Sequence, residues 1–133
     1  MNDESIILVV DDDDGSIERF RTMLEREDHR VLIAGNSTEA LGLAERERPD
    51  LVVLNLKMSG KNEIQILRRI KRIDANMEVI IITGYGTMEA ARKAMELGAF
   101  DYITRPFDSD YITALIKNAL SPVPGELLQL ELK

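Results

Sequence analysis

Four consecutive aspartates at positions 11 to 14 follow directly on an apolar run at residues 6–10. A short apolar run that is rich in β-branched residues and ends in charge is typical of a strand buried on both faces. In open parallel sheets, ligands bind in the crevice beyond the carboxyl ends of the strands. Acidic side chains gathered there would repel one another unless a cation or a basic side chain lies among them. The aspartate run therefore predicts an oxygen-lined cation site at the carboxyl end of a sheet.

The strand before the aspartates is the first of five that the sequence predicts. Strand-like runs alternate with segments whose apolar residues recur at helical spacing, which predicts a parallel sheet with right-handed crossovers and helices on both faces. The predicted strands cover residues 6–10, 31–34, 51–54, 79–83 and 100–104. Because parallel strands end on the same side of a sheet, the aspartates should lie close to Asn55, Thr83 and Arg105.

The predicted helices carry their own start and stop signals. Ser37 is placed to cap the second helix, and Asp108 or Ser109 to cap the fifth. Gly98 follows the fourth helix, where a glycine commonly ends a helix. Met88 and Met95 have helical spacing within that helix, so we expect them to fill the core.

Length and composition narrow the class of protein. The chain has 133 residues, no cysteine and a net charge of −7. One domain is expected over residues 1–120, followed by a linker or tail at 121–133, where two prolines and a glycine interrupt the helical pattern. The acidic balance argues against nucleic-acid binding, and the missing cysteines exclude thiol chemistry. Neither a secretory signal nor a stretch of transmembrane length is evident, so we expect a cytoplasmic protein with no membrane contact.

Four motifs in unbroken order carry a family resemblance. They are LVVDD at 8–12, PDLVVL at 49–54, ITGYG at 82–86 and DYITRPF at 101–107. Together they resemble the receiver domain of two-component response regulators over about residues 5–120, and residues 83–107 resemble receivers of the nitrogen-regulation class. The resemblance implies a (βα)5 flavodoxin-like fold with strand order 2-1-3-4-5. It also implies a non-enzymatic role in phosphorelay signal transduction, with a histidine kinase as partner.

The resemblance also implies a set of site residues. Asp11 and Asp12 match the acidic pair that holds Mg²⁺, a cation that prefers oxygen ligands. Asn55 stands at the phosphoacceptor position, where its amide oxygen can also ligate the metal, and the backbone carbonyl of Lys57 matches a further metal ligand. The phosphoryl pocket and its conformational switch are matched by a threonine, an aromatic residue and a basic residue, namely Thr83, Tyr102 and Arg105.

Three departures from the family pattern surround this one pocket. An amide at position 55 is uncharged and is no nucleophile for phosphoryl transfer. Arg105 replaces the usual lysine, although the two side chains are not interchangeable at a phosphate site. The loop that usually reads Met-Pro-Gly-x-x-Gly is MSGKNE at 58–63, without the proline and the second glycine. We therefore expect an altered loop backbone and only weak Mg²⁺ binding, and we expect Arg105 to pair with Asp11, Asp12 or another carboxylate nearby.

Two classes of function remain open at this stage. The first is a pseudo-receiver that cannot be phosphorylated at Asn55 and acts through protein contacts; its companion interpretation is an orthodox receiver captured as an inactivated variant. The second is a metal-dependent phosphohydrolase on the same fold, although no further acid–base motif accompanies the aspartates. By family analogy a homodimer could form through the fourth helix, fifth strand and fifth helix, whose charged residues are Arg92, Lys93, Glu96, Asp101 and Lys117.

Overall fold

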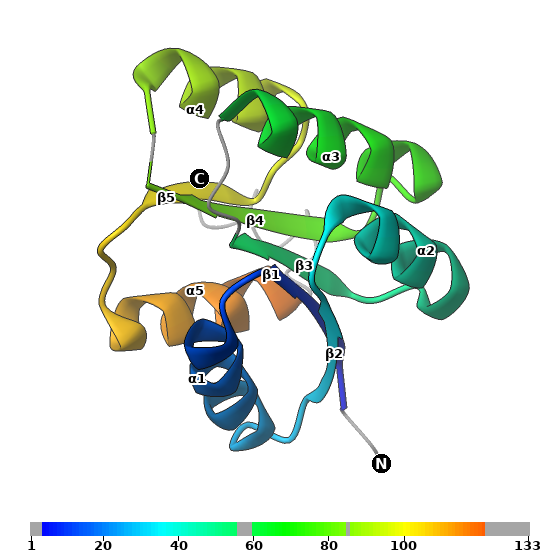
Figure 1. The fold of residues 1–133 in the computed structure, drawn as a ribbon, viewed down its shortest axis with the longest axis vertical. Helices are drawn as coiled ribbons and strands as arrows, with labels where there is room; N and C mark the ends of the chain where they lie inside the picture. The colour runs from blue at the N-terminus through cyan, green and yellow to red at the C-terminus, as the bar shows by residue number, and fades with distance from the viewer. Residues whose placement is uncertain (1–3, 56–59, 85, 122–133) are drawn as a thin grey trace, which may run out of the picture.

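The computed structural model describes residues 4–55, 60–84 and 86–121 (Figure 1). Strands and helices alternate along the chain. The strands are β1 (Ile6–Asp11), β2 (Arg30–Ala34), β3 (Leu51–Asn55), β4 (Glu78–Thr83) and β5 (Asp101–Thr104). The helices are α1 (Asp14–Glu25), α2 (Ser37–Glu47), α3 (Gly60–Ile73), α4 (Met88–Glu96) and α5 (Ser109–Leu120).

The strands form one parallel sheet in the order β2-β1-β3-β4-β5, as the resemblance implies. Helices cover both faces: α1 and α5 lie on one side of the sheet, and α2, α3 and α4 on the other (Figure 1). Alternate residues of each central strand enter opposite cores, so that Leu8 packs toward α2 and α3 while Ile7 and Val9 pack toward α1 and α5. This two-sided burial explains why the central strands are apolar without alternation.

Helix ends agree with the sequence in two places and differ in one. Asp108 caps α5, and Gly98 follows α4 with φ +98°, a conformation that glycine adopts without strain. The cap of α2 is Asn36 rather than Ser37: Asn36 is extended, and its side chain accepts a hydrogen bond from the Glu39 amide at 2.9 Å. Ser37 is already helical, so its side chain lies one position too far along to cap.

The expectation that Met88 and Met95 fill the core is wrong. Met88 is 90% exposed and Met95 is 48% exposed. Helix α4 packs instead through Ala94, which is fully buried, and Leu97, directly after the helix, packs against the core. Helical spacing identified an apolar stripe on α4, but α4 has apolar residues on more than one side and spacing alone does not choose between them.

Within the described part of the chain, no helix is long and apolar enough to cross a membrane. The tail expected at 121–133 lies, apart from Ser121, outside the described residues. Lys57 also lies outside them, and so does most of the loop at 58–63.

Candidate functional site

The carboxyl ends of the central strands bring the expected side chains together. Asp11 pairs with Asn55 across β1 and β3, and the Arg105 amide donates to the Thr83 carbonyl at 2.7 Å across β4 and β5. Asp11, Asn55 and Thr83 are all buried. A buried polar group that has no hydrogen-bond partner destabilises a protein by about 1–3 kcal/mol. Their partners therefore define what this site can do.

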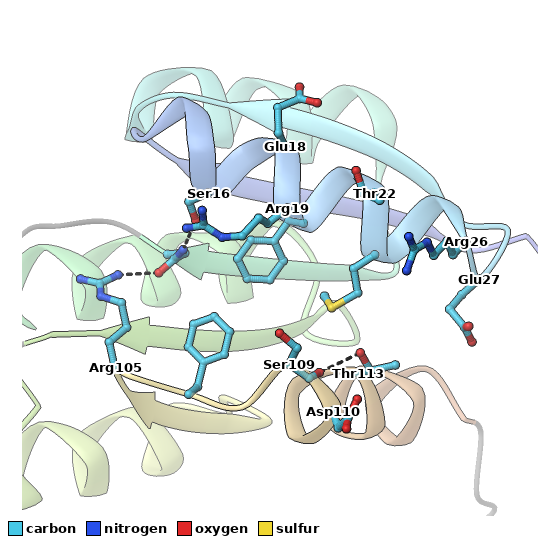
Figure 2. A pocket seen from close by; sticks show the side chains of 14 residues that line it. Ser16, Glu18, Arg19, Thr22, Arg26, Glu27, Arg105, Ser109, Asp110 and Thr113 are labelled. Carbon is cyan, nitrogen blue, oxygen red and sulfur yellow. Dashed lines mark hydrogen bonds between the residues drawn. The ribbon is translucent and has the colours of Figure 1, made fainter.

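The Asn55 amide is the hub of the site. Its nitrogen donates to Asp11 Oδ2 and to Ser16 Oγ, both at 2.9 Å, and its oxygen accepts a hydrogen bond from Arg105 Nη1 at 2.5 Å. Figure 2 draws the bonds that join position 55 to Ser16 and Arg105 as dashed lines. Ser16 lies in the first turn of α1. The Asn55 side chain, at the end of β3, therefore connects β1, α1 and the residue that follows β5.

These partners also fix which way the amide points. Turning it over would bring the amide oxygen against the Asp11 carboxylate and the NH₂ group against the Arg105 guanidinium, so that both ends of the amide would repel. The oxygen therefore faces Arg105 and the hydrogens face Asp11. Glycine at position 84 leaves room for the large guanidinium, because a Cβ there would lie 3.2 Å from Arg105 Nη2.

Arg105 therefore has a different partner from the one expected. Among the described residues it forms no ion pair with Asp11 or Asp12, and it donates to the neutral Asn55 oxygen instead. The Asp11 carboxylate is already satisfied from two sides, because Oδ1 accepts from the Asp13 amide at 2.9 Å and Oδ2 from Asn55.

The four aspartates that opened the sequence have separate roles. Asp11 is buried and bonded within the site, whereas Asp12 is exposed. Asp13 caps α1, its side chain accepting from the Ser16 amide at 2.8 Å, and Asp14 is an exposed residue of the first helical turn. The described residues contain no group of three or more His, Cys, Asp or Glu side chains that could hold a metal. The run is therefore not a four-carboxylate cage.

Sequence reasoning missed one residue of the site, Glu63. It lies in the first turn of α3 with 0% exposure, and neither carboxylate oxygen forms a hydrogen bond of ordinary geometry with a described residue. Burial raises the pKa of Glu63 to about 7, although the nearby Thr83 side chain and the Arg105 charge both act to lower it. The available signal was its position, because Glu63 occupies the place of the second glycine in the family loop.

Tyr102 completes this side of the site. Its ring packs against the core beneath α2, α3 and α4, and its hydroxyl oxygen is buried. Burial raises the pKa of Tyr102, the Glu63 charge raises it further, and a contact with the Thr87 backbone lowers it. Glu63, Thr83, Tyr102 and Arg105 thus form a second group of neighbouring side chains beside the Asn55 hub.

Comparison with known proteins identifies the family. The model of the response regulator receiver domain matches residues 7–117. The chain belongs to the response regulator receiver domain family. It is 40% identical over 114 residues to sporulation initiation phosphotransferase F of Bacillus subtilis, covering 86% of this chain and 92% of that protein. An NtrX-like response regulator of Rickettsia felis is 36% identical over 115 residues, covering 85% of this chain but only 24% of that protein.

A solved receiver structure confirms the architecture. The beryllofluoride-activated NtrC4 receiver domain dimer superposes with a TM-score of 0.79 and 28% identity, covering 86% of this chain and 95% of that one. The five parallel strands of this receiver domain, their order and its five helices are those of the flavodoxin-like receiver fold.

Receiver domains in general bind Mg²⁺ at their phosphorylation site. The Asn55 amide of this receiver domain is not arranged as a ligand for that ion. A cation beside Asp11 Oδ2 would meet the NH₂ hydrogens of Asn55, and the amide oxygen that could ligate it is held by a guanidinium. Oxygen atoms of Asp11 and Asp12 are present at this edge of the sheet, but an aspartate at position 55 would add a carboxylate oxygen and a negative charge that the amide does not supply.

The site opens into a groove of about 620 Å³ between α1 and α5 (Figure 2). Asn55 and Arg105 are among the residues that line it, together with Phe20 and Phe107, whose ring centroids are 6.1 Å apart. Its rim carries charges of both signs, among them Arg19 and Asp110. The groove leaves the hub reachable from one side of the receiver domain.

Proposed function

We propose that this receiver domain is not phosphorylated at position 55 and that it signals through protein contacts rather than as an enzyme. The observation that carries the proposal is the bonding of the Asn55 amide, whose NH₂ group donates to Asp11 and Ser16 and whose oxygen accepts from Arg105. An uncharged amide cannot attack phosphorus as a carboxylate does, and the oxygen of this one already accepts a hydrogen bond from a guanidinium.

The same bonds support a fixed conformation of the site. Where such a site carries an aspartate at this position, a cation is needed to offset the repulsion between the carboxylates. Here the amide dipole links the anion Asp11 to the cation Arg105 directly. Hydrogen bonds to charged groups are worth about 1.5–3 kcal/mol each, so the chain Asp11–Asn55–Arg105 stabilises one arrangement without any ligand.

The test is phosphorylation in vitro. The protein is incubated with Mg²⁺ and acetyl phosphate and weighed intact; no added phosphoryl group is expected. The matched control is the double variant Asn55→Asp, Arg105→Lys, which restores the family residues and should gain one phosphoryl group. A stable adduct on the unaltered pocket would overturn the proposal. A double variant that stays unmodified would place the defect in the loop at 58–63.

Weak Mg²⁺ binding follows from the same geometry. We propose that the ion binds less tightly than in phosphorylatable relatives, with Asp11, Asp12 and the Lys57 carbonyl as its remaining ligands and Asn55 turned away. Titration of the protein with MgCl₂, followed by amide chemical shifts at Asp11 and Asp12, should not saturate at millimolar concentration. Micromolar affinity would contradict this proposal.

The partners are proposed from the family. We infer that the domain contacts a histidine kinase or another cytoplasmic signalling protein, and that it can form a homodimer through α4, β5 and α5. Exposed apolar side chains on α4 and α5, namely Met88, Met95 and Tyr111, support the dimer, and one relative with this fold is a receiver dimer. Lys117 is not directed to that surface: its amine pairs with Glu27, just beyond the end of α1, at 3.3 Å. Analytical ultracentrifugation across a concentration series tests the dimer.

A further inference from the structure

Glu63 carries a completely buried carboxylate. Its side chain is completely buried in the first turn of α3, and both oxygens lack a hydrogen bond of ordinary geometry to a described residue. Burying a carboxylate without a full partner is costly, so such a group either carries a proton or is held by nearby charge. An apolar side chain at position 63 would fill the same space without the cost of burying a carboxylate. A role that requires the carboxylate itself would account for its burial.

The neighbours of Glu63 suggest that role. They are the Thr83 side chain, the Arg105 guanidinium and the Tyr102 ring. These are the three residues that the family pattern assigns to contact with the phosphoryl group and to the switch that follows it. Glu63 itself stands where the family loop has a glycine, a residue with no side chain to enter that space. An anion from the chain has thus been placed beside the groups that would otherwise contact the anion delivered by phosphorylation.

We propose that Glu63 is a resident anion, whose carboxylate takes the part of the phosphoryl group toward Thr83 and Arg105 and holds Tyr102 in its inward position. The inward position is the observed one, with the ring against the core beneath α3 and α4 and the hydroxyl buried. The inference rests on the proposed function, because a phosphoryl group and the Glu63 carboxylate would compete for the same contacts.

The surrounding charges support a carboxylate that can gain or lose its proton near neutral pH. Arg105 and Thr83 favour the charged form and burial opposes it, which leaves the pKa of Glu63 at about 7. Tyr102 of β5, the strand that Arg105 follows, is another titratable side chain, and the Glu63 charge raises its pKa. Helix α4 packs on α3, but its charged side chains are all exposed and so turn away from the core: Glu89, Arg92, Lys93 and Glu96.

The test replaces the carboxylate by an amide of the same shape. Amide and aromatic NMR signals of Thr83, Tyr102 and Arg105 are compared between the unaltered protein and Glu63→Gln at about pH 8.5, where Glu63 is charged, and at about pH 5.5, where it is neutral. We expect the unaltered protein to change between the two conditions at these residues. We expect Glu63→Gln to resemble the low-pH protein throughout and to lose the pH dependence. Glu89→Gln, an exposed first-turn residue of α4, is the matched control and should behave like the unaltered protein.

Identical signals at Thr83 and Tyr102 in the unaltered protein and in Glu63→Gln at high pH would overturn the resident anion. If the variant does not fold, the unaltered protein decides alone. The signals of Thr83 and Tyr102 must then follow the side-chain carboxyl carbon of Glu63 through one shared titration, and their independence would reject the inference. The phosphodonor is absent from all of these samples. An adduct found by mass in the separate acetyl phosphate experiment would reject the proposed function. If that experiment gives no adduct and the NMR signals do not differ between the unaltered protein and Glu63→Gln, only the resident anion is rejected.

Discussion

The Asn55 amide nitrogen donates a hydrogen bond to the Asp11 carboxylate at 2.9 Å. An aspartate at position 55 could not make this bond, because two carboxylates at that distance repel unless a cation or a proton lies between them. Both residues are almost fully buried, so water screens the pair very little. Whether this pocket needs a metal ion therefore depends on the residue at position 55: an aspartate would need one beside Asp11, and asparagine does not.

Asn55→Asp alone is expected to destabilise the protein in the absence of divalent cations. It exchanges a buried hydrogen bond for a like-charge contact, while the new attraction to Arg105 offsets part of the loss. We expect the free energy of unfolding to fall by about 1–3 kcal/mol and to recover in part when Mg²⁺ is added. Urea unfolding with and without MgCl₂ measures both effects.

The exchanged pair Asp11→Asn, Asn55→Asp is the control for that prediction. It returns one amide and one carboxylate to the same two positions, so it should be more stable without Mg²⁺ than Asn55→Asp. It should also lose most of the Mg²⁺ dependence, because only one negative charge remains between the two strands. Equal stability of the double and single variants would show that the Asp11–Asn55 contact is not what matters.

The strands could be predicted from the sequence because their signal is local. Buried parallel strands are continuous apolar runs, and each predicted strand agrees with the structure to within one residue at either end. The same runs place Asp11, Asn55, Thr83 and Arg105 at one end of the sheet, as expected. Side-chain partners are not local, and for this reason the sequence did not identify the hydrogen bond from Arg105 to the Asn55 amide or the position of Glu63 near Arg105.

The burial of Glu63 could not be predicted from the local sequence pattern. A glutamate in a helical segment is most often solvated, and periodicity gives no reason to bury it. Its burial depends on α3, β4 and β5 meeting, which the sequence pattern of α3 alone does not encode. The exposure of Met88 is the opposite case, an apolar residue whose burial no neighbouring element provides.

Two substitutions in the aspartate run distinguish the contributions of Asp13 and Asp14 to stability. Asp13→Ala removes the N-cap of α1, whose side chain accepts from the Ser16 amide, and is expected to cost about 1 kcal/mol of stability. Asp14→Ala removes an exposed charge from the first turn and should cost only a few tenths of a kcal/mol through the helix dipole. Thermal unfolding of the two variants measures the difference, and equal losses would contradict the separate roles given to these aspartates.

Gly86 is expected to be required for the close approach of the segment before α4 to β5. A Cβ at this position would lie 2.1 Å from Thr104 Cγ2, so Gly86→Ala should destabilise the protein by roughly 1–3 kcal/mol. Gly42 in α2 is the matched control, because a Cβ there meets only the end of the flexible Arg46 side chain. Gly42→Ala should stabilise the protein by up to about 1 kcal/mol through helix propensity. Urea midpoints for the two variants should therefore move in opposite directions.

The raised pKa of Glu63 makes stability depend on pH in a stated direction. The ordinary value is 4.5 and the folded value is about 7, so between them the unfolded chain has released a proton that the folded protein keeps. Stability is then highest at or below about pH 4.5 as far as this group is concerned, falls as pH rises to about 7, and is level above it. The loss amounts to at most about 3 kcal/mol.

Because other groups titrate in the same range, the quantity to measure is the difference in unfolding free energy between the unaltered protein and Glu63→Gln. That difference should grow in favour of the glutamine variant as pH rises from 5 to about 7.5. A difference that does not change with pH would mean that Glu63 releases its proton equally easily in the folded and unfolded chains.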